Sequence, residues 1–157
     1  MENEILQYHS FYDYSDVEIQ YSIKTKKLNL DALSDLLKIQ STRGWSFGET
    51  YEGKQLNTAT RQVETITRKR PNTHWVLNSN SLTESNRFEN HADQLLSLLV
   101  PKQNIIKTLM EQKDDFEIMT FIYLTFDVNE KHFGFGTTTE YFKKLSDISH
   151  YIEWRTK

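Results

Sequence analysis

The most apolar stretch of the chain, Phe116 to Phe135, predicts a β-hairpin at the centre of the fold. Residues of one parity lie on one face of a strand, and here they are Phe116, Ile118, Ile122, Leu124, Phe126 and Val128. The other face carries three more apolar residues, Met119, Phe121 and Tyr123. A strand that is apolar on both faces is typically internal and covered on both sides. Polar residues 129–131 predict the turn, and Phe133 and Phe135 predict the return strand.

An alternating pattern from Tyr8 to Leu28 predicts either one long strand or a hairpin that ends near Lys27. Its apolar face consists of Phe11, Val17, Ile19, Tyr21 and Ile23, with a turn or bulge at residues 13–16. A helix is expected next, because the Asn29 side chain can accept from free N–H groups at a helix start. The apolar stripe of this helix is Leu30, Leu33, Leu36 and Leu37.

The middle of the chain is polar. Residues 39–53 predict a loop with large aromatic side chains, and residues 50–72 predict an exposed loop, with a ribbon at its tips as the ordered alternative. Val63 and Ile66 are too sparse to bury such a segment against a core. The sheet is expected to resume at Trp75–Leu77, and residues 79–86 have turn composition.

The last half of the chain predicts helices that alternate with strands. One helical face is formed by Phe88, Ala92, Leu95 and Leu99, and a second helix after Pro101 buries Ile105, Ile106, Leu109 and Met110. Thr137 and Glu140 predict a capping box. The helix that follows has the apolar face Tyr141, Phe142, Leu145 and Ile148. A short strand with Tyr151, Ile152 and Trp154 ends the pattern.

This order of elements predicts a single α+β domain over residues 1–157, a mainly antiparallel β-sheet with three to four helices packed on it. A faint internal echo leaves a second interpretation open. Leu33-Ser34-Asp35 and Leu145-Ser146-Asp147 each lie in a predicted helix between strands, and a tryptophan follows each. A decayed strand-helix-strand duplication would produce this echo, although we favour chance repetition.

The composition excludes several classes of protein but says little about the activity. The 157 residues include no cysteine, which excludes disulfides, zinc–thiolate sites and thiol nucleophiles. A net charge of −3 creates no overall field that would attract nucleic acid or anionic lipid. The start of the chain lacks the pattern of a signal peptide, and no window approaches the roughly 20 apolar residues of a membrane span. We therefore expect a cytoplasmic protein without membrane attachment.

The segment Thr42–Glu49 is the most distinctive local feature. Arg43, Trp45 and Glu49 on a loop could hold a ligand by charge and stacking, and they are the candidate ligand-binding residues. The alternative is structural, with Trp45 and Phe47 covering the leucines of the preceding helix. We favour the structural alternative, because these are the nearest large apolar groups to that helix.

Other chemical signals are weaker. The basic run Arg68–Arg70 has no aromatic partners at stacking spacing, so we expect a solvated loop rather than a phosphate site. The five histidines show no metal-binding spacing, and no serine or threonine has a recognisable partner base. The sequence thus predicts no metal site, no cofactor and no catalytic residue.

Four motifs stand in order along the chain: Tyr8–Phe11, Gln40–Glu49, Trp75–Leu77 and Phe133–Trp154. Together they resemble the bacterial domain of unknown function 4279 family over nearly the whole chain. Gln40 and Ser41 stand where that family usually has a proline step, so this turn is less rigid here. The family has no established catalytic residues to carry over. The resemblance implies a small stand-alone cytosolic protein, and some members resemble immunity proteins encoded beside secreted toxins.

These observations favour a non-catalytic protein-interaction module over an enzyme. The candidate partner is a protein such as a toxin, which would make this chain an immunity protein, and nucleic acid is disfavoured. The alternative is a small-molecule-binding protein or an enzyme that uses the Arg43, Trp45 and Glu49 loop. The sequence leaves the identity of the partner and the oligomeric state open.

Overall fold

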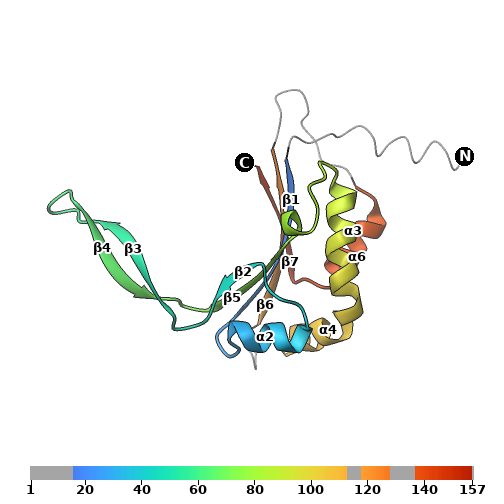
Figure 1. Ribbon diagram of the computed structural model, residues 1–157, viewed down its shortest axis with the longest axis horizontal. Coiled ribbons are helices and arrows are strands. Elements are labelled where there is room, and N and C mark those ends of the chain that lie inside the picture. The colour runs from blue at the N-terminus through green and yellow to red at the C-terminus, as the bar shows by residue number, and fades with distance from the viewer. Residues whose placement is uncertain (1–15, 113–117, 128–136, 157) are drawn as a thin grey trace, which may run out of the picture.

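The computed structural model describes residues 16–112, 118–127 and 137–156, and they form an α+β fold (Figure 1). Its strands are β1 (Val17–Thr25), β2 (Arg43–Trp45), β3 (Thr50–Leu56), β4 (Val63–Lys69), β5 (Thr73–Asn78), β6 (Met119–Phe126) and β7 (Tyr151–Thr156). Its α-helices are α2 (Leu30–Leu37), α3 (Phe88–Leu99), α4 (Gln103–Glu111) and α6 (Thr139–Ser146). The fold class predicted from the sequence is confirmed.

Five strands form the main sheet in the order β2-β5-β1-β6-β7. Neighbouring strands are antiparallel except for β6 and β7, which are parallel and are connected through α6. A parallel pair needs a crossover of this kind, because a tight turn can only reverse the chain. The prediction that the strand at residues 119–126 is internal is confirmed, since β6 lies between β1 and β7. The predicted return strand at Phe133 and Phe135 lies outside the described residues.

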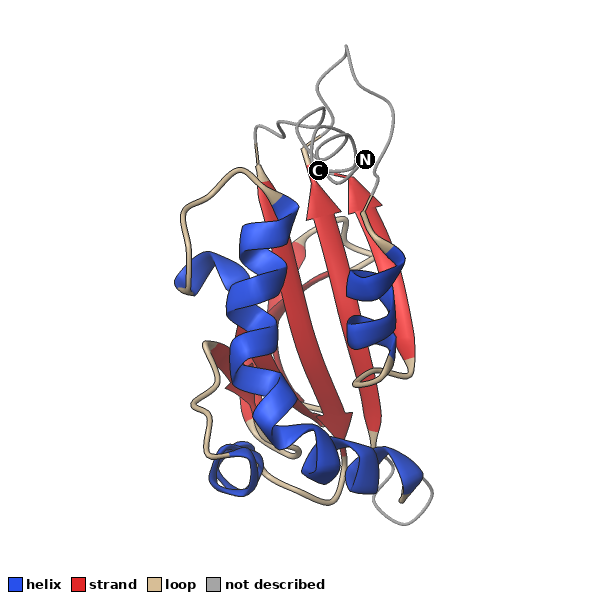
Figure 2. Cartoon of the chain, turned by 90° about the vertical axis from the view of Figure 1, so that its right-hand side faces the viewer, coloured by secondary structure: helices blue, strands red, loops and turns tan. Residues whose placement is uncertain are grey.

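The helices gather on one face of this sheet, where α3 and α6 lie side by side and α2 and α4 lie at one end (Figure 2). The side chains between the two layers form the core. Its sheet side consists of Val17, Ile19, Tyr21 and Ile23 of β1, Trp75 and Leu77 of β5, and Ile122, Leu124 and Phe126 of β6. Its helix side includes Leu33, Leu37, Phe88, Ala92, Leu95, Leu99, Ile106, Leu109 and Leu145. The predicted apolar face of β1 and the predicted core side of β6 are confirmed where the structure describes them, whereas Leu36 of the predicted α2 stripe is 40% exposed. Leu30, Ile105 and Met110 are only partly buried against the core.

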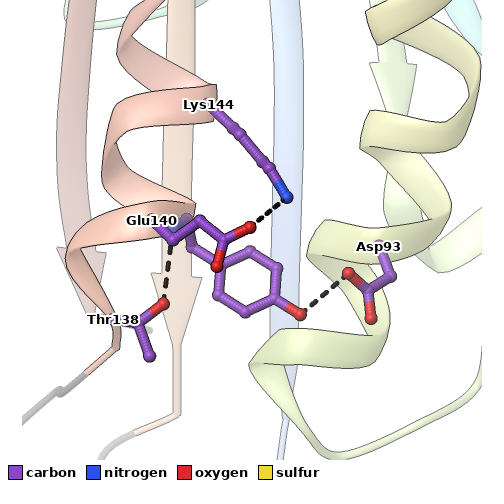
Figure 3. Close-up of polar contacts among 5 residues, drawn as sticks. Asp93, Thr138, Glu140 and Lys144 are labelled. Atoms are coloured by element: carbon purple, nitrogen blue, oxygen red, sulfur yellow. Dashed lines mark hydrogen bonds and ion pairs between the residues drawn. The ribbon is translucent and has the colours of Figure 1, made fainter.

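The helix starts show how local sequence sets the element boundaries. The Asn29 side chain accepts from the Ala32 N–H over 2.8 Å, so the predicted cap of α2 is confirmed. The predicted capping box at Thr137 is wrong by one residue. Thr138 is the N-cap of α6, and its Oγ1 accepts from the Tyr141 N–H (Figure 3). Glu140 pairs with Lys144 one turn later rather than with the cap, at 2.6 Å.

The polar segment at residues 50–70 is ordered, and the expectation of a mainly irregular loop is wrong. β3 and β4 pair antiparallel from Thr50 opposite Lys69 to Leu56 opposite Val63. This two-stranded ribbon projects away from the rest of the fold (Figure 1). The expected exposure is confirmed, because most ribbon side chains are exposed on both faces. The two strands satisfy each other's backbone groups, so the ribbon forms without an apolar face to bury.

The two segments of the internal echo pair differently. In the first, β2 lies against β5 rather than against β1. In the second, β7 lies directly against β6. Trp45 and Trp154 also face opposite sides of the sheet, since Trp45 packs on His74 and Trp154 packs on Phe142 of the helical layer. The echo in sequence therefore has no matching strand arrangement.

Candidate functional site

The face of the main sheet that lies opposite the helices is the candidate site, and we call it the open face. Cross-strand partners share a face, and the register places on this one Gln20, Ser22, Lys24, Arg43, Trp45, His74, Val76, Phe121, Tyr123, Tyr151, Glu153 and Arg155. The helices that the structure describes leave this face uncovered (Figure 2). The sequence predicted that β6 would be covered on both faces. Among the described residues, only side chains of the sheet itself cover its open face.

Aromatic rings and cations cover one half of the open face. The Phe121 ring stacks on Tyr123 with ring centroids 5.8 Å apart and on Tyr151 with centroids 5.3 Å apart. Lys24 Nζ lies 4.9 Å from the Phe121 centroid, and the Arg155 guanidinium lies 3.9 Å from the Tyr123 centroid. This half is therefore a layer of stacked rings capped by positive charge.

A chain of polar side chains crosses the other half. An Arg43 Nη atom donates to Gln20 Oε1, and Gln20 Nε2 donates to Ser22 Oγ over 2.8 Å. The His74 Nε2 atom lies 3.1 Å from the same Ser22 hydroxyl. Gln20 and Ser22 are buried, although they lie on the open face, because these larger side chains enclose them. Arg43 and His74 are consequently fixed in position relative to each other.

The environment of His74 disfavours its protonated form. The pKa of His74 is lowered to about 4, mainly by burial and in addition by the positive charges of Lys24 and Arg43. The imidazole is therefore neutral at neutral pH. The two cations Lys24 and Arg43 therefore both act on the part of the open face around His74.

The base of the β3–β4 ribbon adds a third group beside Trp45. The Arg70 guanidinium lies 3.8 Å from the Tyr51 ring centroid and 4.2 Å from the Trp45 centroid. Trp45 in turn meets His74 edge-to-face with centroids 4.7 Å apart. We call Arg43, Trp45, Tyr51, Arg70 and His74 the corner, because they join the ribbon base to the open face.

The structure brings two of the three sequence-predicted site residues together. Arg43 and Trp45 are two residues apart in β2 and both lie on the open face. Glu49 is instead part of the adjoining turn, where its Oε2 accepts from the Ser46 N–H over 3.0 Å. A site built on Arg43 and Trp45 therefore has Arg70 and His74 beside it rather than Glu49.

The packing that we favoured for this loop, with Trp45 and Phe47 covering the leucines of α2, is wrong. Trp45 contacts His74 on the open face, whereas α2 packs on the other face of the sheet. Phe47 is 54% exposed and covers no leucine of α2. Gly44 faces α2 instead, and a Cβ at this position would come within 2.6 Å of the Leu30 Cδ1 atom and 2.3 Å of the His74 carbonyl oxygen. A glycine is needed because β2 and α2 approach so closely.

Three polar atoms of the corner are buried without a hydrogen-bond partner among the described residues. They are Trp45 Nε1, Arg70 Nε and His74 Nδ1. A buried donor without an acceptor costs about 1–3 kcal/mol. Because these atoms lie together, the corner is the part of the open face with unused hydrogen-bonding groups.

A serine and a histidine that the sequence left unpaired meet elsewhere in the fold. His91 Nδ1 lies 2.8 Å from Ser79 Oγ, and His91 Nε2 lies 2.6 Å from the Ser85 carbonyl oxygen. Nε2 must donate to that carbonyl, so Nδ1 accepts from the Ser79 hydroxyl. Ser79 Oγ also accepts from the Ile19 N–H over 2.8 Å. Both side chains are buried at 1% exposure or less, which excludes them as a hydrolytic pair in this conformation because no substrate can reach them.

Hollows lined by described residues also occur away from the open face. One of about 350 Å³ lies between α2 and α4 and is lined by Leu28, Leu36, Ile105, Thr108, Leu109 and Gln112. Another of about 480 Å³ lies beside α4 and α6 and includes Lys107 and His150. Neither brings together groups that would form a catalytic centre. In the described part of the chain, no helix has the length and apolar character needed to cross a bilayer.

A family model for a domain of unknown function (DUF4279) matches residues 15–157. The chain belongs to this family. The match covers nearly the whole sequence and includes three of the four motifs, which confirms the family resemblance, while Tyr8–Phe11 precedes the matched residues. Neither the curated proteins nor the solved structures include a match to the chain. Because the DUF4279 description assigns no activity, the function must be argued from the open face and the corner.

Proposed function

We propose that this DUF4279 protein is a non-catalytic interaction module that binds a protein partner through the open face. The observation that carries the proposal is the layer of stacked rings at Phe121, Tyr123 and Tyr151, with Arg155 and Lys24 over it. Tyrosine and arginine are enriched at the centres of protein interfaces, where large rigid side chains are buried at low entropic cost. Tyr151 is 52% exposed, so a partner would bury much additional ring surface.

The partner class that fits best is a toxin, with this chain acting in the bacterial cytoplasm as its immunity protein. The family resemblance supports this role, and so does the lack of an assembled catalytic centre among the described residues. An immunity protein needs only to bind and block, which an ordered sheet face can do without chemistry. Rigid aromatic anchors on regular strands also favour binding without rearrangement.

The test uses the protein encoded beside this chain, co-expressed with it and analysed by size-exclusion chromatography. We expect a stable complex that Tyr151→Ala and Arg155→Ala weaken, because both changes remove exposed groups of the open face. Leu98→Ala is the matched control, since Leu98 is an exposed residue of α3 in the helical layer. Rescue of growth by the wild type, but not by the face variants, would support the immunity role.

Two results count against the proposal. The first is a complex that Leu98→Ala disrupts as strongly as the face variants, which would place the interface on the helices. The second is a product of the neighbouring gene that neither binds this chain nor inhibits growth. The second result would remove the toxin as the proposed partner.

One specific observation favours a second candidate function, the binding of a small molecule at the corner. Trp45 Nε1, Arg70 Nε and His74 Nδ1 lack partners there among the described residues. A thermal-shift screen would detect such a ligand as a rise in the unfolding temperature. The rise should be absent in Arg43→Ala, whose substitution removes a charged wall of the corner.

A further inference from the structure

The Arg70 side chain is held in place while its hydrogen-bonding edge remains unused. The guanidinium contacts the rings of Tyr51 and Trp45, with centroid distances of 3.8 Å and 4.2 Å. No hydrogen bond or ion pair joins its side chain to another described residue. A guanidinium stacked in this way keeps its flat faces on the rings, and since Arg70 Nε is itself buried, the Nη atoms are the in-plane donors that a ligand can reach. Such an arrangement is pre-organised for a planar acceptor such as a carboxylate.

Charge around Arg70 favours an anion. Arg43 is exposed and lies on the same face as Trp45, and its guanidinium donates to the neutral Gln20 amide rather than to a carboxylate. Lys24 lies over a ring rather than beside an acid. Lys24 and Arg43 both lie close enough to His74 to lower its pKa, so both cations act on this part of the open face. This positive region is unexpected in a chain of net charge −3.

The neighbouring rings add donors to this charge. Trp45 Nε1 is a donor without an acceptor. Arg70 Nε is a second such donor, and the Arg70 guanidinium lies over the Trp45 ring. A carboxylate has two oxygens and about four lone-pair positions, so it can accept from both Nη groups of Arg70 at once, and it reaches the buried Trp45 Nε1 and Arg70 Nε only when the side chains of the corner move to uncover them. A neutral amide in the same place would satisfy fewer donors and would leave the positive charge uncompensated.

We propose that the corner binds a carboxylate of an acidic segment in the partner protein. The planar array of N–H donors of Arg70, which we call the fork, is the anchor, and Arg43 is the second cation. The inference rests on the proposed function, because the segment belongs to the protein that covers the open face. Tyr51 and Trp45 are positioning residues that hold the guanidinium flat. His74 stays neutral and contributes its ring edge to Trp45.

The test uses this protein alone with a short blocked peptide that carries two glutamates around a tyrosine. The control peptide has glutamines in place of the glutamates. Binding is followed by NMR through the Arg70 Nε–H and Trp45 Nε1–H resonances. We expect saturable shifts with the acidic peptide only, and about tenfold weaker binding in Arg70→Gln, since a charge-assisted pair is removed.

Three further variants test whether binding depends on the planar guanidinium of Arg70 or only on positive charge. Arg70→Lys keeps the charge but loses the fork, so we expect it to bind nearly as weakly as Arg70→Gln. Arg43→Gln is the second variant and replaces an exposed residue, which keeps the test valid if Arg70 variants fold poorly. Lys69→Gln is the matched control, because it removes the same charge from the adjacent exposed residue. Binding should be unchanged in Lys69→Gln.

The outcomes are decisive in each direction. Equal weakening by Lys69→Gln would overturn the proposal, since it would show non-specific attraction. Saturable shifts with inorganic phosphate but not with the acidic peptide would also overturn it, because the corner would then serve a different anion. No shift with any of these ligands would do the same. The acidic peptide could bind while the co-expression experiment gives no complex. This result would support the carboxylate site and would show that the neighbouring gene product is not the partner that supplies the carboxylate.

Discussion

The indole of Trp75 donates to the hydroxyl of Ser34 over 3.0 Å and thereby fastens β5 to α2. Both residues are buried, and the bond joins positions 41 residues apart in the sequence. Trp75 also meets Tyr21 edge-to-face, with ring centroids 6.3 Å apart. The elements β1, α2 and β5 are therefore joined at one point of the core.

Ser34→Ala should lower the free energy of unfolding. The Trp75 Nε1–H would lose its acceptor inside the core, and an unsatisfied buried donor costs about 1–3 kcal/mol. Ser146→Ala is the control, because Ser146 occupies the same place in the second Leu-Ser-Asp motif but is exposed and donates to Lys143 of its own helix. Urea denaturation should show a loss for Ser34→Ala and almost none for Ser146→Ala. Equal losses would mean that the Trp75 bond adds no stability.

The core side of β6 should be the most sensitive part of the sheet. Leu124 is fully buried between β1 and β7, and it lies opposite Ile19. Leu124→Ala should reduce the free energy of unfolding by about 2–5 kcal/mol, because the cavity cannot collapse within a paired strand. Leu36→Ala is the matched control, since Leu36 is 40% exposed on α2. A loss below about 1 kcal/mol for Leu124→Ala would show that the strand is peripheral.

Limited proteolysis should attack the tip of the ribbon before any other described segment. Arg61 lies in the turn between β3 and β4 and has a positive φ of 55°, which keeps this residue out of the strand pairing. A two-stranded ribbon without a core is marginally stable, and exposed turns are the preferred sites of cleavage. Trypsin should therefore cut after Arg61 before it cuts after Arg68, which is paired with Tyr51. First cleavage within β1, β5 or β6 would contradict this order.

The sequence predicted the buried faces well because periodicity reports burial directly. Ile19, Tyr21 and Ile23 alternate with polar residues, and the structure buries all three against the helices. Periodicity could not predict strand direction, so the parallel pairing of β6 with β7 came only from the structure. The ribbon was predicted only as the alternative to an irregular loop, for a related reason. Its pairing satisfies backbone groups, and it leaves no apolar face that a hydrophobic pattern could reveal.

The candidate site was predicted only in part because its residues come from separate elements. Arg43 and Trp45 stood out in one short segment, whereas Tyr51, Arg70 and His74 were scattered in polar sequence. The short strand β2 explains the difference, because its pairing with β5 turns Trp45 toward His74 and away from α2. Parity along β2 could have indicated this, if residues 43–45 had been recognised as a strand. Arg70 gave no signal of its own, since its role depends on the ribbon bringing Tyr51 beside it.

The environment of His74 predicts a pH dependence of stability with a definite sign. The pKa of His74 is lowered from 6.5 in the unfolded chain to about 4 in the fold, mainly by burial and further by Lys24 and Arg43. Between these values the unfolded state binds more protons than the folded state, so stability rises with pH. The contribution is fully present above pH 6.5 and is lost as pH falls toward 4.

Two measurements check this dependence. The urea midpoint of the wild type should fall between pH 7 and pH 5, and His74→Gln should show a smaller fall because its side chain does not titrate. NMR titration of the His74 ring should give a midpoint far below 6.5. Lys24→Gln should move that midpoint upward toward the ordinary value, since one of the two nearby cations is removed. A wild-type midpoint near 6.5 would show that the imidazole is freely solvated, and it would remove the evidence that Lys24 and Arg43 act on this ring.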